Sequence, residues 1–429
     1  MRFFGSGLWQ RTIKHGQDRI VGYGLFDRLY EGELVAAAKD RRTKYREAAF
    51  NFARPVVNAS AGFLAGKGIE WRVAGNDRLT RLAGDIWDRS GGDLAFLEAS
   101  LTGAIAGDLG VQVAMTPDGP IIRFLDPGIC HPEFDPHDYR MLRSFTVAYQ
   151  AEDAQGGKFK HFEMWKDGRA EDEDGNLLDT YDESLLDGVP FAWIRNQGRL
   201  GKQYGSSDLK GLAELTTSYD HLARKQYGSL DYFLEPNLLI KNANDLKVED
   251  FGGRRAFKVG KDADISFIES EGEKPGIDEA LARTFDAICR VSETPRHVFG
   301  DVIEIGDVSG TALKLMFTPL ITKTRRKQST YGPALEWAMW QALLLAGAPR
   351  NFEVRTVNVV WPDPVPTNER ELRDVLETEK RLGASTSQVL GKLGYTVEQV
   401  AEAKRENDAA AEEMVRRSQL AITRGVQMP

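Results

Sequence analysis

The sequence predicts an α+β protein in which long amphipathic helices flank a smaller region of β-strands. Alternation of apolar and polar residues, which is typical of half-buried strands, is concentrated between positions 111 and 194. On either side of this region, apolar residues recur at spacings of three and four over long segments, as on one face of a helix. The length of 429 residues is enough for two or three domains with a substantial core.

The N-terminal part is predicted to be helical. Apolar residues at helical spacing around Pro55 predict a helix over 43–65. We expect this helix to be kinked or broken at Pro55, because proline removes one helical hydrogen bond. A second helix is predicted over 77–107.

The central region has the period of two that strands require. Alternation begins at Val111 and resumes after the turn-forming residues 117–120, which predicts a β-hairpin. Further strands are predicted over 142–149, 158–165 and 189–194, so the first half of the chain is predicted to contain a β-meander.

Long helical patterns dominate the second half. A stripe of leucines and a tyrosine predicts a helix from Ser206 to Phe233, and one of the three residues 206–208 is expected to cap it. Helices are also predicted over 275–293 and over 309–346, the latter bent by two internal prolines. The other predicted elements are short strands within 236–272, a strand over 352–361 and charged helices from 367 onward.

The connection 295–308 between two predicted helices mixes charged and apolar side chains. Arg296 and His297 precede four apolar residues and several acidic ones. A connection of this length without secondary structure is uncommon in a compact protein and is often functional. It can also be an ordinary helix–helix connection whose apolar residues pack into the core, and composition does not separate the two interpretations.

The charge balance argues against tight nucleic-acid binding. The formal net charge is −8, from 56 Lys and Arg against 64 Asp and Glu. Tight DNA binding depends on neutralising phosphates with basic residues, so any contact of this chain with DNA is expected to be loose. The basic run 323–327 is expected to be a solvated helix face, with a DNA or acidic-partner contact as the second interpretation.

Sequence motifs of catalysis are missing. The chain has no phosphate-binding loop of the G-x-x-x-x-G-K-[ST] type, no H-E-x-x-H and no G-x-S-x-G. Residues 130–138 contain Cys, His, Asp and Glu and could be taken for a metal site, as in a metal-dependent hydrolase. Zinc sites usually have tighter paired spacing, so a surface loop is the favoured interpretation.

The sequence predicts a protein outside the membrane that assembles in a reducing compartment. The first residues have no long apolar core or small-residue cleavage site, and the longest apolar stretch, 338–348, is too short to cross a bilayer. Cys130 and Cys289 lie far apart in the sequence, so a structural disulfide is not expected.

Several strings, in this order along the chain, resemble the siphophage-type portal protein family of tailed bacteriophages. The most specific is Ser292-Glu-Thr-Pro295, a variable loop and then Val308-Ser-Gly-Thr-Ala-Leu-Lys314, which resembles the family's proline turn and S-G-x-A-L-K helix start. Three other segments resemble the family: 121–127 its hairpin ending in Asp-Pro, 194–219 its N…GxSDL passage, and 361–407 its C-terminal strand end and helices. The resemblance spans about residues 45–410, whereas 236–272 and the first forty residues carry no family pattern.

The resemblance implies that the chain has a portal fold of the α+β class. It also implies that copies of the chain, typically twelve, form a ring at one vertex of the capsid. Laid onto this sequence, it implies a β-rich and helical wing at 1–205, stem helices at 206–235 and 274–294, a small α/β clip at 236–273, a tunnel loop at 295–308, a kinked wing helix and strand at 309–365 and a helical crown at 366–429.

The resemblance also implies partners and site residues. The partners would be other copies of the chain, double-stranded DNA bound without sequence preference, the terminase large subunit, a head-completion adaptor, and the major capsid and scaffolding proteins. The protein would be a part of the virion, assembled in the host cytoplasm, and would have no catalytic residues, metal, cofactor or membrane contact. The implied tunnel-loop residues are Arg296, His297, Val298, Phe299, Asp301, Val302, Ile303 and Glu304, and the implied partner-binding clip residues are Lys247, Arg254, Arg255 and Lys258. The alternative is a DNA-binding or capsid-associated structural protein that forms no ring.

Overall fold

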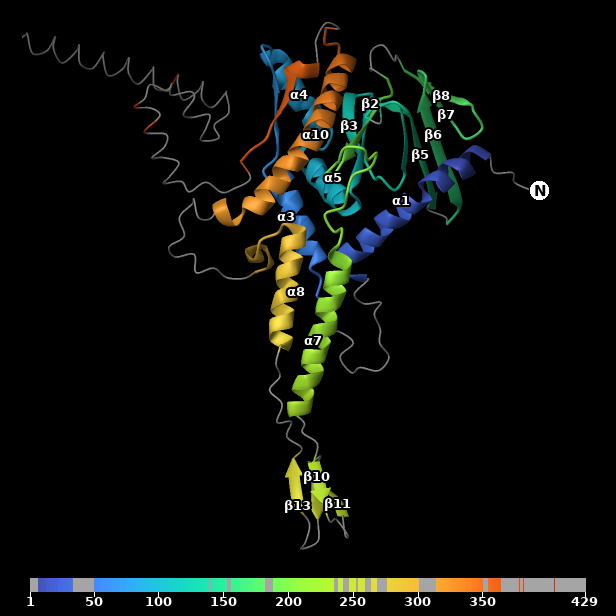
Figure 1. Cartoon of the computed structure of the whole chain (residues 1–429). Coiled ribbons are helices and arrows are strands. Elements are labelled where there is room, and N and C mark those ends of the chain that lie inside the picture. The colour runs from blue at the N-terminus through green and yellow to red at the C-terminus, as the bar shows by residue number, and fades with distance from the viewer. Residues whose placement is uncertain are drawn as a thin grey trace, which may run out of the picture. The chain divides into compact units, whose positions relative to one another are not determined.

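The structure is a computed structural model, and one compact unit, 1–307 with 314–364, contains all the helices and strands named below (Figure 1). The predicted crown lies outside the described residues except at three isolated positions. The described residues are 7–33, 50–138, 140–152, 156–181, 188–234, 238–241, 247–251, 254–258, 264–267, 276–300, 314–349, 354–363, 378, 381 and 405.

Two N-terminal helices differ from the prediction. Helix α1, Gly7–Glu31, was not predicted from the sequence. Helix α3 spans Ala53–Ala65, so it begins two residues before Pro55 instead of bending there. A proline in the first helical turn costs no hydrogen bond, because the N–H groups of that turn have no partner within the helix.

The helix predicted over 77–107 is two helices, α4 (Asp77–Arg89) and α5 (Gly92–Ala106). The chain turns at Gly91, whose φ of 94° is readily adopted only by glycine, and the prediction of one continuous helix was wrong. Asn76 caps α4 by accepting a hydrogen bond from the backbone N–H of Leu79 at 3.0 Å.

The predicted hairpin and strands are confirmed, and they form two antiparallel sheets. The hairpin and one distant strand form a sheet in the order β3 (Gly119–Leu125), β2 (Asp108–Thr116), β9 (Phe191–Arg195). The other sheet has the order β4 (Cys130–Phe134), β5 (Leu142–Glu152), β6 (Lys158–Lys166), β7 (Arg169–Glu171), β8 (Leu177–Thr180).

The surface loop predicted at 130–138 is wrong for its first five residues. Residues 130–134 are strand β4, in which Cys130 pairs with Val147 and His131 with Thr146. Both side chains are buried, and that of Cys130 packs in an apolar cluster with Phe145, Val147, Val189 and Phe191. Cys130 and Cys289 are both buried and form no disulfide.

Helices α7 (Leu212–Leu234) and α8 (Ile277–Ser292) lie side by side (Figure 1). The prediction over 275–293 is confirmed. The first helix begins six residues later than predicted, after a turn that contains residues 207–211. Along the chain, two antiparallel strand pairs separate these helices. They are β10 (Leu238–Lys241) with β13 (Asp264–Phe267) and β11 (Lys247–Phe251) with β12 (Arg254–Lys258).

Helix α10 spans Thr318–Leu345 and follows a separate helical turn at 314–316. Pro319 is at its second position and therefore marks its start, whereas Pro333 lies inside it. The long predicted helix is thus shorter than expected, and 309–313 lie outside the described residues. Strand β14 (Val357–Val360) follows the short 3-10 helix Val354–Thr356 and pairs with β1 (Glu70–Val73).

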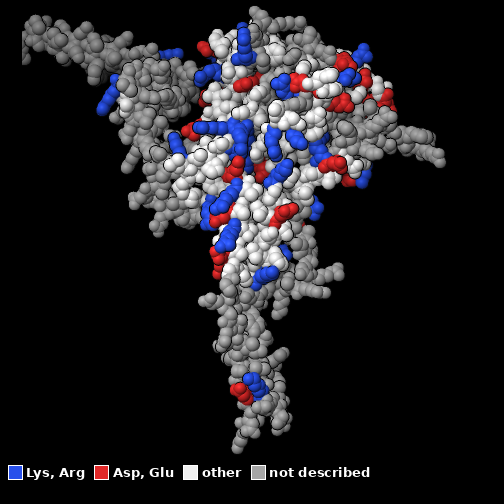
Figure 2. Space-filling model, viewed as in Figure 1, with Lys and Arg blue, Asp and Glu red and all other residues white. Residues whose placement is uncertain are grey.

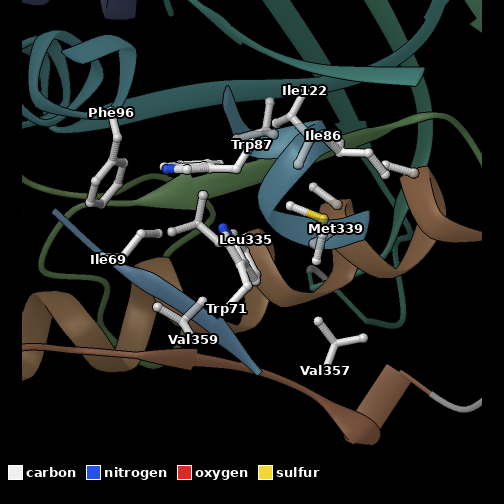
Figure 3. Close-up of a cluster of buried hydrophobic side chains, with 14 of the residues drawn as sticks. Ile69, Trp71, Ile86, Trp87, Phe96, Ile122, Leu335, Met339, Val357 and Val359 are labelled. Carbon is white, nitrogen blue, oxygen red and sulfur yellow. The ribbon is translucent and has the colours of Figure 1, made fainter. Parts of the chain in front are cut away.

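The main hydrophobic core lies between α10, α4, α5 and the strands β1, β2, β3, β9 and β14. Figure 3 shows Trp71, Trp87, Leu335 and Met339 converging in this core from strand β1 and helices α4 and α10. The two tryptophan rings meet edge to face with centroids 5.4 Å apart. A second cluster joins α1, α3 and α5 to α7 and α8, so the long helices are attached to the rest of the unit by apolar packing.

Candidate functional site

The most unusual chemistry of the described residues lies where α7 begins, α8 ends and α10 passes both. Asp208, Lys323 and Lys327 form an ion cluster there, called the Asp208 cluster below. The Lys327 Nζ donates a hydrogen bond to Asp208 Oδ2 at 2.6 Å, and the Lys323 Nζ lies 3.3 Å from the same oxygen. The Asp208 and Lys327 side chains are 0% exposed and that of Lys323 is 2% exposed.

The Asp208 cluster contradicts one prediction from the sequence, that 323–327 is a solvated face. Asp208 was one of three candidates for a helix cap, and here its side chain enters the cluster instead. Only Arg325 and Arg326 of that basic run are exposed, whereas the two lysines face inward. Burying charges is costly unless they are paired and hydrogen-bonded, so this cluster must be held in a defined geometry.

Further polar groups complete the cluster. The side-chain amides of Asn196 and Gln197 donate to Asp208 Oδ1 at 2.9 and 2.6 Å. Lys323 also donates to the backbone carbonyl of Ser292, the last residue of α8, at 3.1 Å. Two cations and one carboxylate therefore connect the start of α7, the end of α8 and the first part of α10.

The charges of the cluster shift each other's ionisation. The two neighbouring ammonium groups hold the pKa of Asp208 below its ordinary value despite burial, so it remains an anion. Burial lowers the pKa of Lys327 to about 8, because desolvation and repulsion by Lys323 outweigh the attraction of Asp208.

Close backbone packing places Asp208 at this point. Any Cβ at Gly205 would collide with the Gly107 carbonyl oxygen and would lie 2.6 Å from Asn196 N. The Asp208 N–H then donates to the Ala104 carbonyl at 2.9 Å. The Gly-x-Ser-Asp-Leu string that carries part of the family resemblance thus has a physical cause, because its glycine permits the approach and its aspartate enters the cluster.

A second buried carboxylate supports the same segment. Asp108 accepts hydrogen bonds from the Gly205 N–H at 2.7 Å and from the Tyr23 hydroxyl at 2.6 Å. Desolvation raises the pKa of Asp108 to about 6. Arg19 donates to the Cys130 carbonyl at 2.6 Å and stacks on the ring of Tyr204 at 4.9 Å, so helix α1 is tied to the strands here.

Aromatic rings join the long helices to the start of the predicted tunnel loop. Phe299 lies 5.3 Å from Phe285 of α8 and 6.0 Å from Phe52 at the start of α3, measured between ring centroids. Phe52 in turn meets Tyr219 of α7 at 4.8 Å. These contacts fix residues 296–299, which form a short 3-10 helix, against three helices.

The structure divides the tunnel-loop residues predicted from the sequence. Arg296 pairs with Asp286 at 2.8 Å, and the His297 ring lies 6.5 Å from that of Phe317. Val298 and Phe299 belong to the same packed turn, which ends at Gly300 with φ 96°. This part of the connection is packed as an ordinary helix–helix connection would be, whereas Asp301, Val302, Ile303 and Glu304 lie outside the described residues.

The four predicted clip residues all lie on one strand pair. In the antiparallel register of β11 and β12, Lys247 is opposite Lys258, and Arg254 and Arg255 are opposite Phe251 and Asp250. The structure thus brings the four positions together on one hairpin-like pair. The described residues of 236–273 are strands, and no helix is among them.

The sequence contained a signal for the buried lysines that the prediction did not use. Lys323, Lys327, Tyr331, Leu335 and Met339 are spaced by four, and residues at this spacing share one helix face. The last three are fully buried apolar or aromatic residues. Continuing their stripe toward the helix start places the two lysines in the interior, where they need an anion.

Exposed basic residues gather near the same place. Figure 2 shows many Lys and Arg side chains across the middle of this face, with some Asp and Glu side chains among them. The segment from Lys314 to Pro333 contains five basic residues and no acidic one. Lys314, Arg325 and Arg326 are exposed, and Arg326 pairs with Glu293.

Neither a metal centre nor a membrane-crossing helix is found in the described part of the chain. No three His, Cys, Asp or Glu side chains there are grouped closely enough to hold a metal ion, and this includes the described residues of 130–138. Among the helices described, none combines the length and the apolar character needed to cross a bilayer.

Comparison with known proteins gives one consistent result. The family model described as "Phage portal protein, SPP1 Gp6-like" matches residues 10–416. A curated relative, the portal protein of Mycobacterium phage D29, is 24% identical over 276 residues, which are 59% of this chain and 55% of the relative. The match to that relative therefore spans about half of its length.

Two solved structures share the fold. One is a chain from the neck of a native gene transfer agent particle, computed with C12 symmetry, with a TM-score of 0.50, 15% identity and coverage of 80% of this chain and 91% of that chain. The other is a chain from the virion of a native gene transfer agent particle, with a TM-score of 0.51, 13% identity and coverage of 87% and 93%.

Proposed function

The chain belongs to the SPP1 Gp6-like family of phage portal proteins, and we propose that copies of it form a closed ring around a channel through which double-stranded DNA enters and leaves a capsid. The single observation that carries the proposal is the family match over residues 10–416, nearly the whole chain. The mixed helix and sheet fold, shared with neck and virion chains of gene transfer agent particles, agrees with it. We propose twelve subunits and a place at the portal vertex of the virion.

The surface of the described unit supports a ring. A closed ring needs two different surfaces of one chain that fit each other head to tail. The α7–α8 pair keeps apolar side chains in solvent on the single chain, since Val291 is 50% exposed and Tyr227 39% exposed. Leu200 and Leu94 on the rest of the unit are 94% and 67% exposed. Neighbouring copies would cover such residues.

We propose that the tunnel loop, 295–308, narrows the channel. The aromatic contacts of Phe299 and the ion pair of Arg296 fix its start against α3 and α8, and Arg296, His297, Val298 and Phe299 would line the channel there. Val302 and Ile303 would touch the duplex, together with Asp301 and Glu304. Acidic and apolar residues do not neutralise phosphates, so the contact would let DNA slide instead of holding it.

We propose that the strand pairs of 236–273 form the clip. Lys247, Arg254, Arg255 and Lys258 on β11 and β12 would bind the terminase large subunit and later a head-completion adaptor. ATP hydrolysis would be performed by the terminase, so this chain acts as a conduit without catalytic residues or cofactor. Contacts with the major capsid and scaffolding proteins during assembly in the host cytoplasm complete the proposal.

Electron microscopy of the purified chain tests the ring. We expect annular particles in negative stain. In size-exclusion chromatography the protein should elute at a mass far above the 47.8 kDa of one chain. A folded monomer at every concentration would overturn the ring and favour the alternative of a capsid-associated protein without one.

A deletion tests the tunnel loop. Removing 301–305 leaves Phe299 and its aromatic contacts intact, so rings should form while DNA packaging is lost. A matched control removes 173–175 from the turn between β7 and β8, a surface segment far along the chain from the loop. Packaging at the normal level by the 301–305 deletion would refute the role of the loop.

A further inference from the structure

We propose that Lys323 and Lys327 are positioning residues that couple the two stem helices to α10 and thereby fix the tunnel loop during DNA packaging. This inference rests on the proposed portal function and goes beyond it, because it assigns a role in packaging to side chains that are buried away from DNA and from any partner. The Asp208 cluster carries the argument.

The two lysines lie one helical turn apart on α10 and make different connections. Lys327 binds Asp208, four residues before α7 begins. Lys323 binds the Ser292 carbonyl, where α8 ends, and approaches Asp208 as well. One face of α10 therefore binds both the start of α7 and the end of α8, the two proposed stem helices.

The tunnel loop is attached to the same point from both sides. It begins at Pro295, three residues after Ser292, and its chain returns into α10 five residues before Lys323. Glu293, between Ser292 and the loop, forms an ion pair with Arg326 on the outer face of α10. A shift of α8 along α10 would break this pair and the Lys323 contact together, and it would carry the start of the loop with it.

Stability alone does not explain the choice of charged residues. Replacing a buried ion cluster by apolar side chains of similar volume is often neutral or stabilising, because the charges no longer lose their hydration. Among the described residues, this cluster has two buried cations and only one carboxylate, so one positive charge is not balanced. Burial also lowers the pKa of Lys327, which shows that its charged form is disfavoured there. Apolar packing would tolerate small sliding movements, whereas the hydrogen bonds of 2.6 and 3.1 Å that the two lysines donate weaken steeply once their distance or angle changes. The charges are therefore suited to fixing positions.

Lys323→Met is the main test. This variant keeps the Lys327–Asp208 pair, now one cation to one anion, and removes the link to α8. We expect rings to form at the normal yield with unchanged thermal stability, and heads with little nuclease-protected DNA. The measurement is made in a phage whose own portal gene is inactivated and replaced in trans, and the control is Arg325→Met, an exposed residue of the same helix.

A second variant, Asp208→Asn with Lys323→Met and Lys327→Met, removes all charge while it keeps the volume. Rings without packaged DNA from either variant support the coupling role. Normal packaging by both variants overturns it, and so does a failure of both to fold, since the cluster would then be needed for folding alone. If the unaltered chain forms no ring or supports no packaging, the proposed portal function fails instead.

Discussion

Asp208→Asn tests whether the charge of the buried carboxylate is what holds the junction together. The substitution keeps the size and the hydrogen-bond acceptor, but leaves the Lys323 and Lys327 ammonium groups buried without an anion among the described residues. Breaking a buried ion pair by removing one partner typically costs about 3–5 kcal/mol. Because one carboxylate serves two lysines here, we expect a loss at the upper end of that range.

Thermal unfolding followed by circular dichroism measures this loss. The entropy of unfolding is about 2.1 cal/mol/K per residue, so in a unit of this size a loss of about 5 kcal/mol should lower Tm by about 6 °C. The matched control is Asp286→Asn, which breaks the half-exposed pair with Arg296 and should cost about 1 kcal/mol or less. Equal melting of the two variants would refute the argument from burial.

The pH dependence of Asp208→Asn provides a second check. Lys327 has its pKa lowered to about 8 in the folded protein, below the ordinary 10.5, so the unfolded chain binds more protons between these values. Stability should therefore rise with pH in that window. Without the carboxylate, Lys327 loses its proton more readily, so the stability deficit of the variant should shrink as the pH is raised. A deficit that stays constant from pH 7 to pH 10 would contradict this account.

Two further predictions concern the same segment. Gly205→Ala places a Cβ against the backbone of Gly107 and Asn196 and should destabilise the fold by about 3 kcal/mol or prevent folding, because backbone atoms cannot easily move aside. The control is Gly62→Ala, at an exposed helical position where a Cβ would have no atom within 4 Å, and it should stabilise the fold by about 0.5–1 kcal/mol. Chemical denaturation measures the free energy of unfolding of both variants. The pKa of Asp108 is about 6 in the folded protein against an ordinary 3.8, so between these values the folded chain binds a proton that the unfolded chain does not. Stability should therefore fall as the pH rises through this window. Asp108→Asn should flatten that part of the curve of Tm against pH, and an unchanged slope would assign this pH dependence to other groups.

Local patterns in the sequence were enough to predict most of the elements. Period-two alternation located the hairpin β2–β3 and strands β5, β6 and β9, and helical stripes located α7, α8 and α10. Helix α1 and strand β4 were missed. Other errors lie where one residue changes the local geometry. Gly91 divides a helical pattern in two, Pro55 lies in the first turn of a helix where a kink or a break was expected, and Pro319 marks a helix start where a bend was expected.

The sequence strings that resemble the portal family identified the family correctly, although their physical meaning was not visible in them. The glycine and aspartate of Gly205-Ser-Ser-Asp-Leu209 suggested only a helix start. In the fold, Gly205 allows two backbone segments to touch, and Asp208 meets lysines more than a hundred positions further along the chain. No spacing rule within a single segment can predict such a contact.

The sequence by itself determined the α+β class, the order of the main helices and strands and the family, because these depend on local periodicity and on short strings of neighbouring residues. Only the tertiary structure decided which partners the buried charges find. Lys323 and Lys327 lie in a run that looks solvated, and Asp208 lies where a helix cap is expected. Their burial becomes favourable only when α10 passes the start of α7 and the end of α8, since each charge then finds partners that are distant in the chain.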